Sequence, residues 1–292
     1  MSAITRRAAV LGHPIAHSRS PELHRAAYRY LEFDCDYAAI DVEEEAAADF
    51  AAAVRQEPGW NGLSVTMPLK SAMAAAVDTL DPLAEALGVI NTVTFEPGAG
   101  GTVLTGWNTD VAGLVNALRH AGAGDAPKAA VLGAGGTATA AVAALTELGC
   151  SSVDIYARSF RGDAGGQPAV QEVGSRLGTD VALHGWDMAA AACAEADVVI
   201  CTLPPRGADG IAGEFADLGR RRDGAVLLDA AYDPWPSAIA AAWQAAGGTI
   251  VPGLEMLLYQ AVEQVRLFTR DAFRDERAVI NVMCDAVGLP QR

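Results

Sequence analysis

A glycine-rich turn between an apolar stretch and an alanine-rich stretch most constrains the fold of this chain. Residues 133–138 have the sequence Gly-Ala-Gly-Gly-Thr-Ala, and they lie between the apolar run 129–132 and a predicted helix over 137–148. In the pattern G-x-G-x-x-G/A the first glycine permits a tight turn and the second lets the backbone approach a pyrophosphate. The small last residue lets helix and strand pack closely. The free N–H groups at the start of such a helix bind phosphate. We therefore predict a dinucleotide site formed by Gly133, Ala134, Gly135, Gly136 and Thr137.

Strands and helices alternate in the region that contains this turn. Helical stretches separate five short apolar runs, which span residues 129–132, 153–156, 198–201, 226–228 and 249–251. Such alternation predicts parallel βαβ units that build a doubly wound sheet. We therefore expect an α/β protein with a Rossmann-type domain over residues 110–253.

The remaining residues predict a second α/β unit. Three short strands and a hairpin are expected over residues 8–11, 36–40, 62–66 and 89–105. A chain of 292 residues is long enough for two domains. We expect residues 1–109 to form the first domain and the C-terminal helices in 254–292 to pack back on it.

Composition and charge exclude several classes of function. The net charge of −15 and the small size of the Lys/Arg clusters argue against a nucleic-acid surface, because phosphate binding needs clustered cations. Five scattered cysteines indicate a reducing compartment, and five histidines without metal-ligand spacing indicate no metal site. No signal peptide or membrane-spanning stretch is evident. We expect a cytoplasmic protein that acts on a small molecule as a monomer or homodimer.

The end of the second strand of the Rossmann-type domain distinguishes NADP from NAD. NAD enzymes usually place Asp or Glu there to hold the ribose 2′-hydroxyl. In this chain Asp154 lies inside the predicted strand, too early to reach the ribose. Arg158 can pair with a 2′-phosphate and stack on adenine, and Ser159 can add a hydrogen bond. We predict NADP as the cofactor, bound at this end by Ala157, Arg158, Ser159 and Arg161.

Four polar segments before the glycine turn carry further candidate residues. Taken singly, each has an ordinary structural explanation: Ser20 can cap the helix that Pro21 begins, Lys70 can be a solvated charge, and Asp110 can belong to a helix cap. Ser18 is not explained in this way, and two serines two positions apart can donate hydroxyls to one carboxylate. Lys70 follows a Thr-x-Pro turn, which can hold its ammonium in place. The segments span residues 12–24, 62–70, 88–93 and 106–113.

Together and in this order, these segments resemble the shikimate dehydrogenase family over nearly the whole chain. The resemblance implies an N-terminal substrate-binding domain, completed by the C-terminal helices, and a central NADP domain. Three positions depart from the commoner pattern, because Asn is frequent where this chain has Arg25, Ser64 and Ala157; the last change removes a possible adenosine contact. The matching stretches are GHPIAHSRSPELH at 12–24, GLSVTMPLK at 62–70, INTV at 90–93, GWNTD at 106–110, GAGG at 133–136 and GLEMLLYQA at 253–261.

The same resemblance implies roles for individual residues. Lys70 and Asp110 would be the catalytic pair at the hydroxyl that becomes a ketone, with Lys70 as general acid in reduction and general base in oxidation. Ser18 and Ser20 would bind the substrate carboxylate, and Gly253 is expected at the cofactor site. Contacts to the ring hydroxyls and the rest of the pocket are implied for Thr66, Asn91, Gln260 and Tyr232. The implied reaction is the reversible reduction of 3-dehydroshikimate to shikimate by NADPH.

Other functions remain open at this point. An NAD-dependent quinate/shikimate dehydrogenase shares these motifs, although an acidic residue at the end of the second strand would favour it and none is present. A preference for an amino-shikimate substrate is a further alternative. A non-catalytic regulatory protein of the same fold would be signalled by loss of Lys70 or Asp110, and both are present. A tetrahydrofolate-type dehydrogenase is disfavoured by the paired serines, which suit a small carboxylate.

Overall fold

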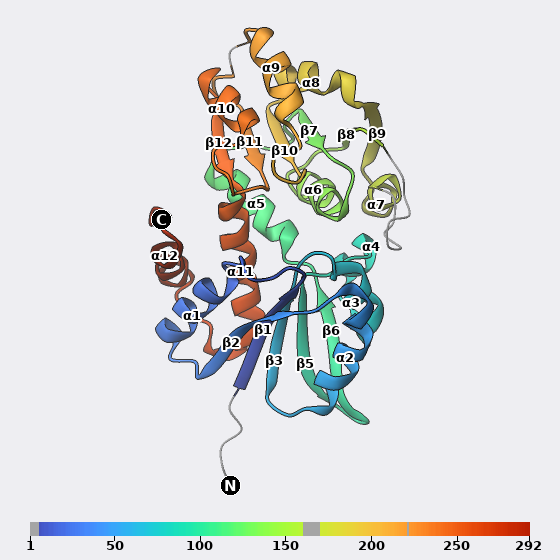
Figure 1. Ribbon diagram of the computed structural model, residues 1–292, viewed down its shortest axis with the longest axis vertical. Coiled ribbons are helices and arrows are strands. Elements are labelled where there is room, and N and C mark those ends of the chain that lie inside the picture. The colour runs from blue at the N-terminus through green and yellow to red at the C-terminus, as the bar shows by residue number, and fades with distance from the viewer. Residues whose placement is uncertain (1–5, 160–169, 221) are drawn as a thin grey trace. The chain divides into compact units, whose positions relative to one another are not determined.

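The computed structural model describes residues 6–159, 170–220 and 222–292 (Figure 1). The chain forms two compact units, the first made of residues 1–109 with 258–292 and the second of residues 110–257. Each unit contains one six-stranded sheet with helices around it. The predicted α/β class is confirmed. The second unit ends within a helix, since α11 (Gly253–Thr269) begins before the division.

The sheet of the second unit consists of parallel strands in the order β9-β8-β7-β10-β11-β12. Numbered within the unit, this is the order 3-2-1-4-5-6 of dinucleotide-binding folds. Strands β7, β10 and β11 are buried along their whole length, as in parallel sheets with both faces covered. The strands are β7 (Ala129–Leu132), β8 (Ser152–Ala157), β9 (Asp180–Gly185), β10 (Val198–Cys201), β11 (Val226–Asp229) and β12 (Thr249–Pro252).

Helices connect the strands of this sheet. The alanine-rich helix α6 (Gly136–Glu147) follows β7, and most of its residues are buried because its small side chains let neighbouring elements approach from several sides. Strand β9 was not predicted, and its residues are at most half-buried. The glycine-rich segment 162–166 of the sequence lies outside the described residues. The other helices are α5 (Asp110–His120), α7 (Val170–Leu177), α8 (Ala189–Glu195), α9 (Asp209–Asp217) and α10 (Ala238–Ala245).

The sheet of the first unit is mixed, with the order β2-β1-β3-β5-β6-β4. Strands β2, β1 and β3 are parallel, whereas β5 is antiparallel to both β3 and β6. The ends of β1, β3 and β6 and the beginning of β5 consequently meet at one edge of the sheet. The strands are β1 (Arg6–Gly12), β2 (Cys35–Asp41), β3 (Trp60–Val65), β4 (Thr79–Leu80), β5 (Thr92–Gly98) and β6 (Gly101–Trp107).

Helices from both ends of the chain cover this sheet, and α1 packs against α12. A short 3-10 turn, Glu44–Ala46, precedes α2. In the described part of the chain no helix has the length and hydropathy needed to cross a membrane. The helices are α1 (Ser20–Leu31), α2 (Ala47–Gln56), α3 (Lys70–Ala76), α4 (Pro82–Leu87), the part of α11 from residue 258 onward, and α12 (Glu276–Val287).

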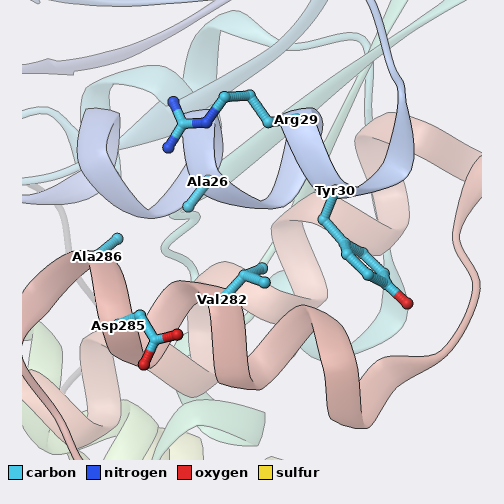
Figure 2. A pocket seen from close by; sticks show the side chains of 6 residues that line it. All are labelled: Ala26, Arg29, Tyr30, Val282, Asp285 and Ala286. Atoms are coloured by element: carbon cyan, nitrogen blue, oxygen red, sulfur yellow. The ribbon is translucent and has the colours of Figure 1, made fainter.

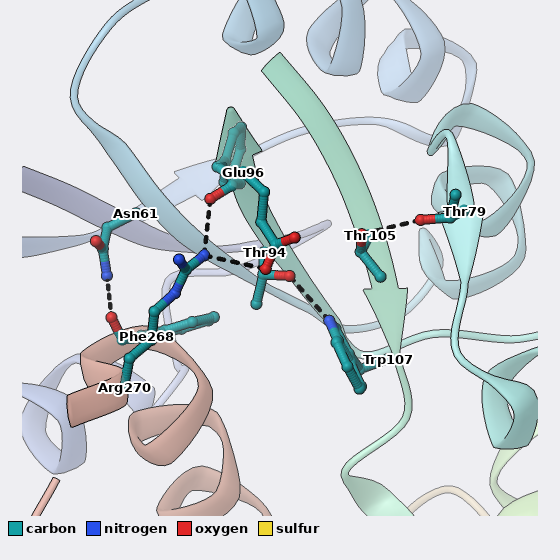
Figure 3. A network of polar contacts seen from close by, with 9 residues as sticks. Asn61, Thr79, Thr94, Glu96, Thr105, Trp107, Phe268 and Arg270 are labelled. Atoms are coloured by element: carbon teal, nitrogen blue, oxygen red, sulfur yellow. Dashed lines mark hydrogen bonds and ion pairs between the residues drawn. The ribbon is translucent and has the colours of Figure 1, made fainter. Parts of the chain in front are cut away.

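Polar contacts join the end of α11 to the sheet of the first unit (Figure 3). The Asn61 side chain donates to the carbonyl oxygen of Phe268, and Arg270 donates to the carbonyl oxygen of Phe95 at 3.0 Å. A Cβ atom on Gly62 would overlap the Phe268 ring, so the glycine lets α11 pack directly against β3. The C-terminal helices therefore pack on the N-terminal unit, as predicted.

Candidate functional site

One edge of the first unit's sheet collects the polar segments that the sequence singles out. Backbone hydrogen bonds tie their loops together: the His13 N–H donates to the Met67 carbonyl at 3.1 Å, and the Val65 N–H donates to the Asn91 carbonyl at 2.7 Å. The loop after β1, the turn after β3 and the start of β5 are thus neighbours, although they are far apart in the sequence.

The serine loop after β1 is ordered by its own hydrogen bonds. Ser18 Oγ accepts from the Ser20 N–H at 3.3 Å, and Ser20 is buried whereas Ser18 is half-buried. The predicted N-cap at Ser20 is wrong by one residue, because α1 already begins at Ser20 and Arg19 takes the cap position without a side-chain cap bond. The Ser20 hydroxyl is instead hydrogen-bonded to Tyr37.

A carboxylate anchors the beginning of the same loop. Asp41 Oδ1 lies 2.6 Å from His13 Nδ1, and the other oxygen of Asp41 accepts from the Ile15 N–H at 3.2 Å. The hydrogen bond and the charge of Asp41 raise the pKa of His13, and the same contact lowers the pKa of Asp41. Because both side chains are exposed, water screens this pair.

Lys70 is the first residue of α3, at the end of the turn that follows β3. The Leu69 N–H closes this turn by donating to the Thr66 carbonyl at 2.9 Å, and the Ile90 N–H donates to the Lys70 carbonyl at 3.2 Å. Thr66 and Lys70 are both half-buried. The Lys70 backbone is therefore held on both sides at this edge of the sheet.

Asn91 lies at the centre of a buried amide cluster. Its Oδ1 accepts from the Thr109 N–H at 2.8 Å, while its Nδ2 donates to Thr109 Oγ1 at 2.9 Å and to Gln260 Oε1 at 3.2 Å. All three residues are buried. The structure therefore brings together Asn91 and Gln260, two of the residues predicted to contact ring hydroxyls.

A second polar network, which the sequence interpretation missed, lies against this cluster. Gln264 is buried on α11 and donates to the Asn91 carbonyl at 2.9 Å and to Thr92 Oγ1 at 3.0 Å. Its own oxygen accepts from Ser64 Oγ at 2.7 Å. The signal in the sequence is the spacing of Gln260 and Gln264, because residues four apart share a helix face.

His24 is buried beside this network. Its ring stacks on Tyr37 with 4.1 Å between centroids, and its Nε2 lies 3.1 Å from Gln264 Oε1. Burial lowers the pKa of His24 to about 3, although the hydrogen bond with Gln264 opposes the shift. The imidazole is therefore neutral in the folded protein at neutral pH.

The glycine turn of the second unit has the geometry that a dinucleotide requires. Gly133 has a φ of 109°, which favours glycine, and a Cβ there would lie 2.6 Å from Thr202 Oγ1. Gly135 precedes α6, and a Cβ at this position would meet no atom within 4 Å. Ala138 is fully buried. The turn therefore leaves its backbone open beside the start of α6, where a pyrophosphate would bind.

The place of this turn in the sheet also fits a cofactor. It follows β7, which pairs with β8 on one side and β10 on the other, and the connections leave this point in opposite directions. Ligands of open parallel sheets bind outside the strand ends at such a reversal of strand order. Residues 133–137 form the turn after β7 and the first residues of α6.

Strand β8 ends at Ala157, and the exposed Arg158 follows it. The Arg158 guanidinium donates to the Gly207 carbonyl and lies 5.3 Å from the centre of a Trp186 ring, so contacts on two sides restrain it. The exposed Ser159 comes next. These residues form a cationic and polar end to β8, as a 2′-phosphate requires.

The acidic residue near this position is engaged elsewhere. Asp154 lies inside β8, and its carboxylate oxygen is 2.8 Å from His184 Nε2 of the neighbouring β9. Because Asp154 lies inside the strand and not at its end, it is too early to take the place of an NAD-binding carboxylate, as the sequence indicates. Arg161 lies outside the described residues.

Tyr232 belongs to the loop after β11 and is 39% exposed. Asp229, at the end of β11, accepts from Ser237 Oγ at 2.6 Å and from the Ala231 N–H at 3.2 Å. Burial raises the pKa of Asp229, while these hydrogen bonds oppose the shift. The carboxyl group thus ties together both ends of the loop that carries Tyr232.

Gly253, the first residue of α11, lies against the same loop. A Cβ atom at this position would overlap the carbonyl group of Ala230. Packing alone therefore demands glycine here, and the predicted contact between Gly253 and the cofactor stays a prediction.

Asp110 is the first residue of α5 and is only 6% exposed. It belongs to the second unit, whereas Lys70 belongs to the first. The action of Lys70 and Asp110 as a pair therefore stays a prediction, as does the approach of Tyr232 to the substrate residues of the first unit.

A surface hollow of about 490 Å³ lies between α1 and α12 (Figure 2). None of the predicted site residues is among the described residues that line it, so the hollow is separate from the candidate site. Within residues 6–159, 170–220 and 222–292, no group of three His, Cys, Asp or Glu side chains could hold a metal ion. The hollow is lined by Ala26, Arg29, Tyr30, Val282, Asp285 and Ala286.

Acid should destabilise the protein through His24. The unfolded chain takes up this proton near pH 6.5 and the folded chain near pH 3, so the contribution of the neutral imidazole is full above pH 6.5 and is lost as the pH falls towards 3. The slope approaches about 1.4 kcal/mol per pH unit. Urea denaturation at several pH values should show a shallower slope for His24→Gln than for the wild type. Equal slopes in the wild type and His24→Gln would contradict this assignment.

Comparison with known sequences agrees with this geometry. Residues 10–93 match the family model described as the shikimate dehydrogenase substrate binding domain. An NADP(+) shikimate dehydrogenase of Mesorhizobium japonicum is 37% identical over 260 residues, which cover 88% of each chain. One from Methanothermobacter thermautotrophicus is 30% identical and covers 89% of each chain.

Solved structures agree over almost the whole length. The shikimate dehydrogenase of Mycobacterium tuberculosis has a TM-score of 0.81 and 38% identity, with coverage of 97% of this chain and all of that one. The Thermus thermophilus enzyme, solved in complex with NADP(H) and shikimate, has a TM-score of 0.76 and 28% identity, with coverage of 96% and 99%. Because relatives of 30% identity or more cover at least 88% of it, the chain belongs to the shikimate dehydrogenase family.

Proposed function

We propose that this protein catalyses the reversible, NADPH-dependent reduction of 3-dehydroshikimate to shikimate. The observation that carries the proposal is the edge of the first sheet, where the serine loop, the Lys70 turn and the Asn91–Gln260 cluster gather. Its hydroxyl, amide and ammonium groups suit a small carboxylate that bears ring hydroxyls. NADP-dependent shikimate dehydrogenases match 88% of the chain, and the Thermus relative was solved with NADP(H) and shikimate.

Ser18 and Ser20 are proposed to bind the substrate carboxylate. Ser20 is the first residue of α1, and Ser18 lies just before this helix. Helix α1 has twelve residues, and its N-terminal dipole favours a negative charge. The hydrogen bond from the Ser20 N–H to Ser18 Oγ keeps the two hydroxyls close together. Ser18 can thus donate to one oxygen of a carboxylate, and Ser20, whose hydroxyl is hydrogen-bonded to Tyr37 without the substrate, would turn its proton to the other oxygen.

The ring hydroxyls are proposed to contact Thr66, Asn91 and Gln260, with Tyr232 completing the pocket. The two amides are buried and hydrogen-bonded to each other, so their orientation is set before the substrate arrives. Preorganised amides of this kind distinguish a hydroxylated ring from one that lacks the hydroxyl, because unpaired polar groups would otherwise stay buried.

Lys70 is proposed to move the proton. Bound NADPH would supply the hydride to the ring ketone. Lys70 Nζ donates a proton to the oxygen of that ketone during reduction and takes it back during oxidation. Asp110 is proposed to orient Lys70 and the substrate hydroxyl, which makes it the second member of the pair.

The cofactor is proposed to lie along the strand ends of the second unit. The open backbone of the glycine turn and the start of α6 would hold the pyrophosphate, with Ala134, Gly136 and Thr137 supplying N–H groups. Arg158 and Ser159, together with Arg161, would hold the 2′-phosphate. We further propose that the protein is cytoplasmic and acts as a monomer or homodimer.

An assay of nicotinamide absorbance tests the proposed reaction. Shikimate with NADP should give rapid cofactor reduction, whereas exchanging shikimate for quinate, or NADP for NAD, should lower kcat/KM. Faster turnover of quinate or of NAD would replace this proposal with that of a quinate dehydrogenase. Absence of turnover with every pair would favour a non-catalytic protein of the same fold.

Replacing Lys70 should remove the proton transfer while leaving substrate binding largely intact. Lys70→Ala should lower kcat by about 10²- to 10⁴-fold and change KM only a few-fold, since the lost group acts mainly in the transition state. Lys128→Ala is the matched control, because Lys128 is exposed and is the only other lysine in the sequence. Steady-state kinetics with shikimate give the result, and an unchanged kcat in Lys70→Ala would exclude the role.

Replacing Arg158 should weaken the binding of NADPH more than the binding of NADH. Loss of a charge-assisted contact to the 2′-phosphate predicts a rise of about tenfold to a hundredfold in the KM for NADPH in Arg158→Ala. The KM for NADH should change little, because NADH has no 2′-phosphate. Arg176→Ala, which removes an exposed arginine of α7, should leave both values unchanged. Equal effects of Arg158→Ala on the two cofactors would mean that Arg158 does not contact the 2′-phosphate.

A further inference from the structure

We infer that Gln264 and Thr92 are positioning residues that set the hydrogen-bond polarity of Asn91 and Gln260, and so decide which end of the Gln260 amide is turned away from Asn91. The inference rests on the proposed function, which assigns both amides to the substrate. The donor and acceptor directions in the buried network around Gln264 carry it.

The direction of the network is fixed first at Ser64. The Tyr37 hydroxyl donates to Ser64 Oγ at 2.7 Å, and Ser64 Oγ donates to Gln264 Oε1 at 2.7 Å. A serine hydroxyl has one proton. Because Ser64 Oγ accepts a hydrogen bond from Tyr37, its own proton is available to donate a hydrogen bond to Gln264. This contact requires the oxygen end of the Gln264 amide.

The position of His24 agrees with this orientation of Gln264. Its Nε2 lies 3.1 Å from Gln264 Oε1, and its Nδ1 lies 3.4 Å from the Tyr28 hydroxyl. The imidazole is fully buried and neutral, so it carries one proton. Because Gln264 Oε1 can only accept, that proton is on Nε2 and Nδ1 accepts from Tyr28. If the Gln264 amide were reversed, its NH₂ group would face the proton of the Ser64 hydroxyl.

The NH₂ end of Gln264 then fixes Thr92. Gln264 Nε2 donates to Thr92 Oγ1 at 3.0 Å, and Thr92 Oγ1 donates its single proton to Asn91 Oδ1 at 2.8 Å. The Thr109 N–H donates to the same oxygen at 2.8 Å. With two donors aimed at this atom, the oxygen of Asn91 is fixed on the side of Thr92 and Thr109.

The NH₂ end of Asn91 in turn fixes Gln260. Asn91 Nδ2 donates to Gln260 Oε1 at 3.2 Å, so Gln260 turns its oxygen to Asn91 and directs its NH₂ end away from it. A group that meets this end must accept a hydrogen bond. A hydroxyl can do so, whereas an ammonium at the same ring position cannot. The relay Tyr37–Ser64–Gln264–Thr92–Asn91–Gln260 thereby favours a hydroxylated substrate over an aminated one.

The test removes one proton from the middle of the relay. Thr92→Val is nearly isosteric and leaves Asn91 Oδ1 without the Thr92 donor. The KM for shikimate should rise tenfold or more, whereas kcat should stay within threefold and the KM for NADP within twofold. Thr92→Ser, which keeps the hydroxyl, should restore the KM to within threefold of the wild type. An unchanged KM for shikimate in Thr92→Val would overturn the inference.

A double-mutant cycle separates positioning from general destabilisation. If Thr92 acts through Asn91, then Thr92→Val should change the KM by less than twofold in an Asn91→Ala background. Multiplication of the two single effects would overturn the inference. The matched control is Thr94→Val, which removes another buried threonine hydroxyl of β5 that accepts from Trp107 Nε1 at 2.9 Å outside the relay (Figure 3). It should lower the melting temperature without changing the KM for shikimate.

Gln264→Met provides a second route if Thr92→Val fails to fold. It removes both ends of the Gln264 amide and should show the same rise in KM for shikimate, again without additivity to Asn91→Ala. A wild-type protein that does not oxidise shikimate would contradict the proposed function and the inference together. An active wild type with additive or absent effects of these variants would contradict the inference alone.

Discussion

The hydrogen bonds of one buried residue, Asn91, connect β3, β6 and α11 in the first unit. Its backbone N–H donates to the Trp107 carbonyl at 3.0 Å, and its backbone oxygen accepts from Val65 at 2.7 Å and from Gln264 at 2.9 Å. Leaving such a group buried and unpaired costs about 1–3 kcal/mol, so β3, β6 and α11 must keep their positions around it. The bonds that fasten the C-terminal helix to the sheet are therefore those that shape the candidate substrate site.

Much of the fold can be predicted from local sequence. Some elements and contacts cannot be predicted in this way. Strands β7 and β10 match the predicted ranges to the residue, because short apolar runs there end in turns. The partly exposed strand β9 and the short alanine-rich helix α8 were not predicted. In the site, motifs located the Asn91 segment and the glycine turn. They did not locate the contact of Gln264 with Ser64, because the two partners are 200 residues apart and only the fold brings them together.

The overall charge places a condition on how anions can bind to this protein. At a net charge of −15 the molecule repels a carboxylate and a phosphorylated dinucleotide at long range. Binding must then depend on short-range donors, which water and salt screen less when they are partly enclosed. The buried Ser20 at the start of α1 is a donor of this kind. An acidic surface and anionic ligands are thus compatible.

The close approach of Gly253 to Ala230 links two segments that the sequence keeps apart. A methyl group at position 253 would press on the backbone of the loop that continues to Tyr232. Such a change would alter the binding of any ligand of Tyr232 indirectly, because it would displace the loop that carries Tyr232. This would hold even if residue 253 contacted no ligand. Loss of activity in a variant at this glycine would therefore be no measure of contact with a cofactor. Because the two segments are in direct contact, the sequence of each limits which residues the other can contain.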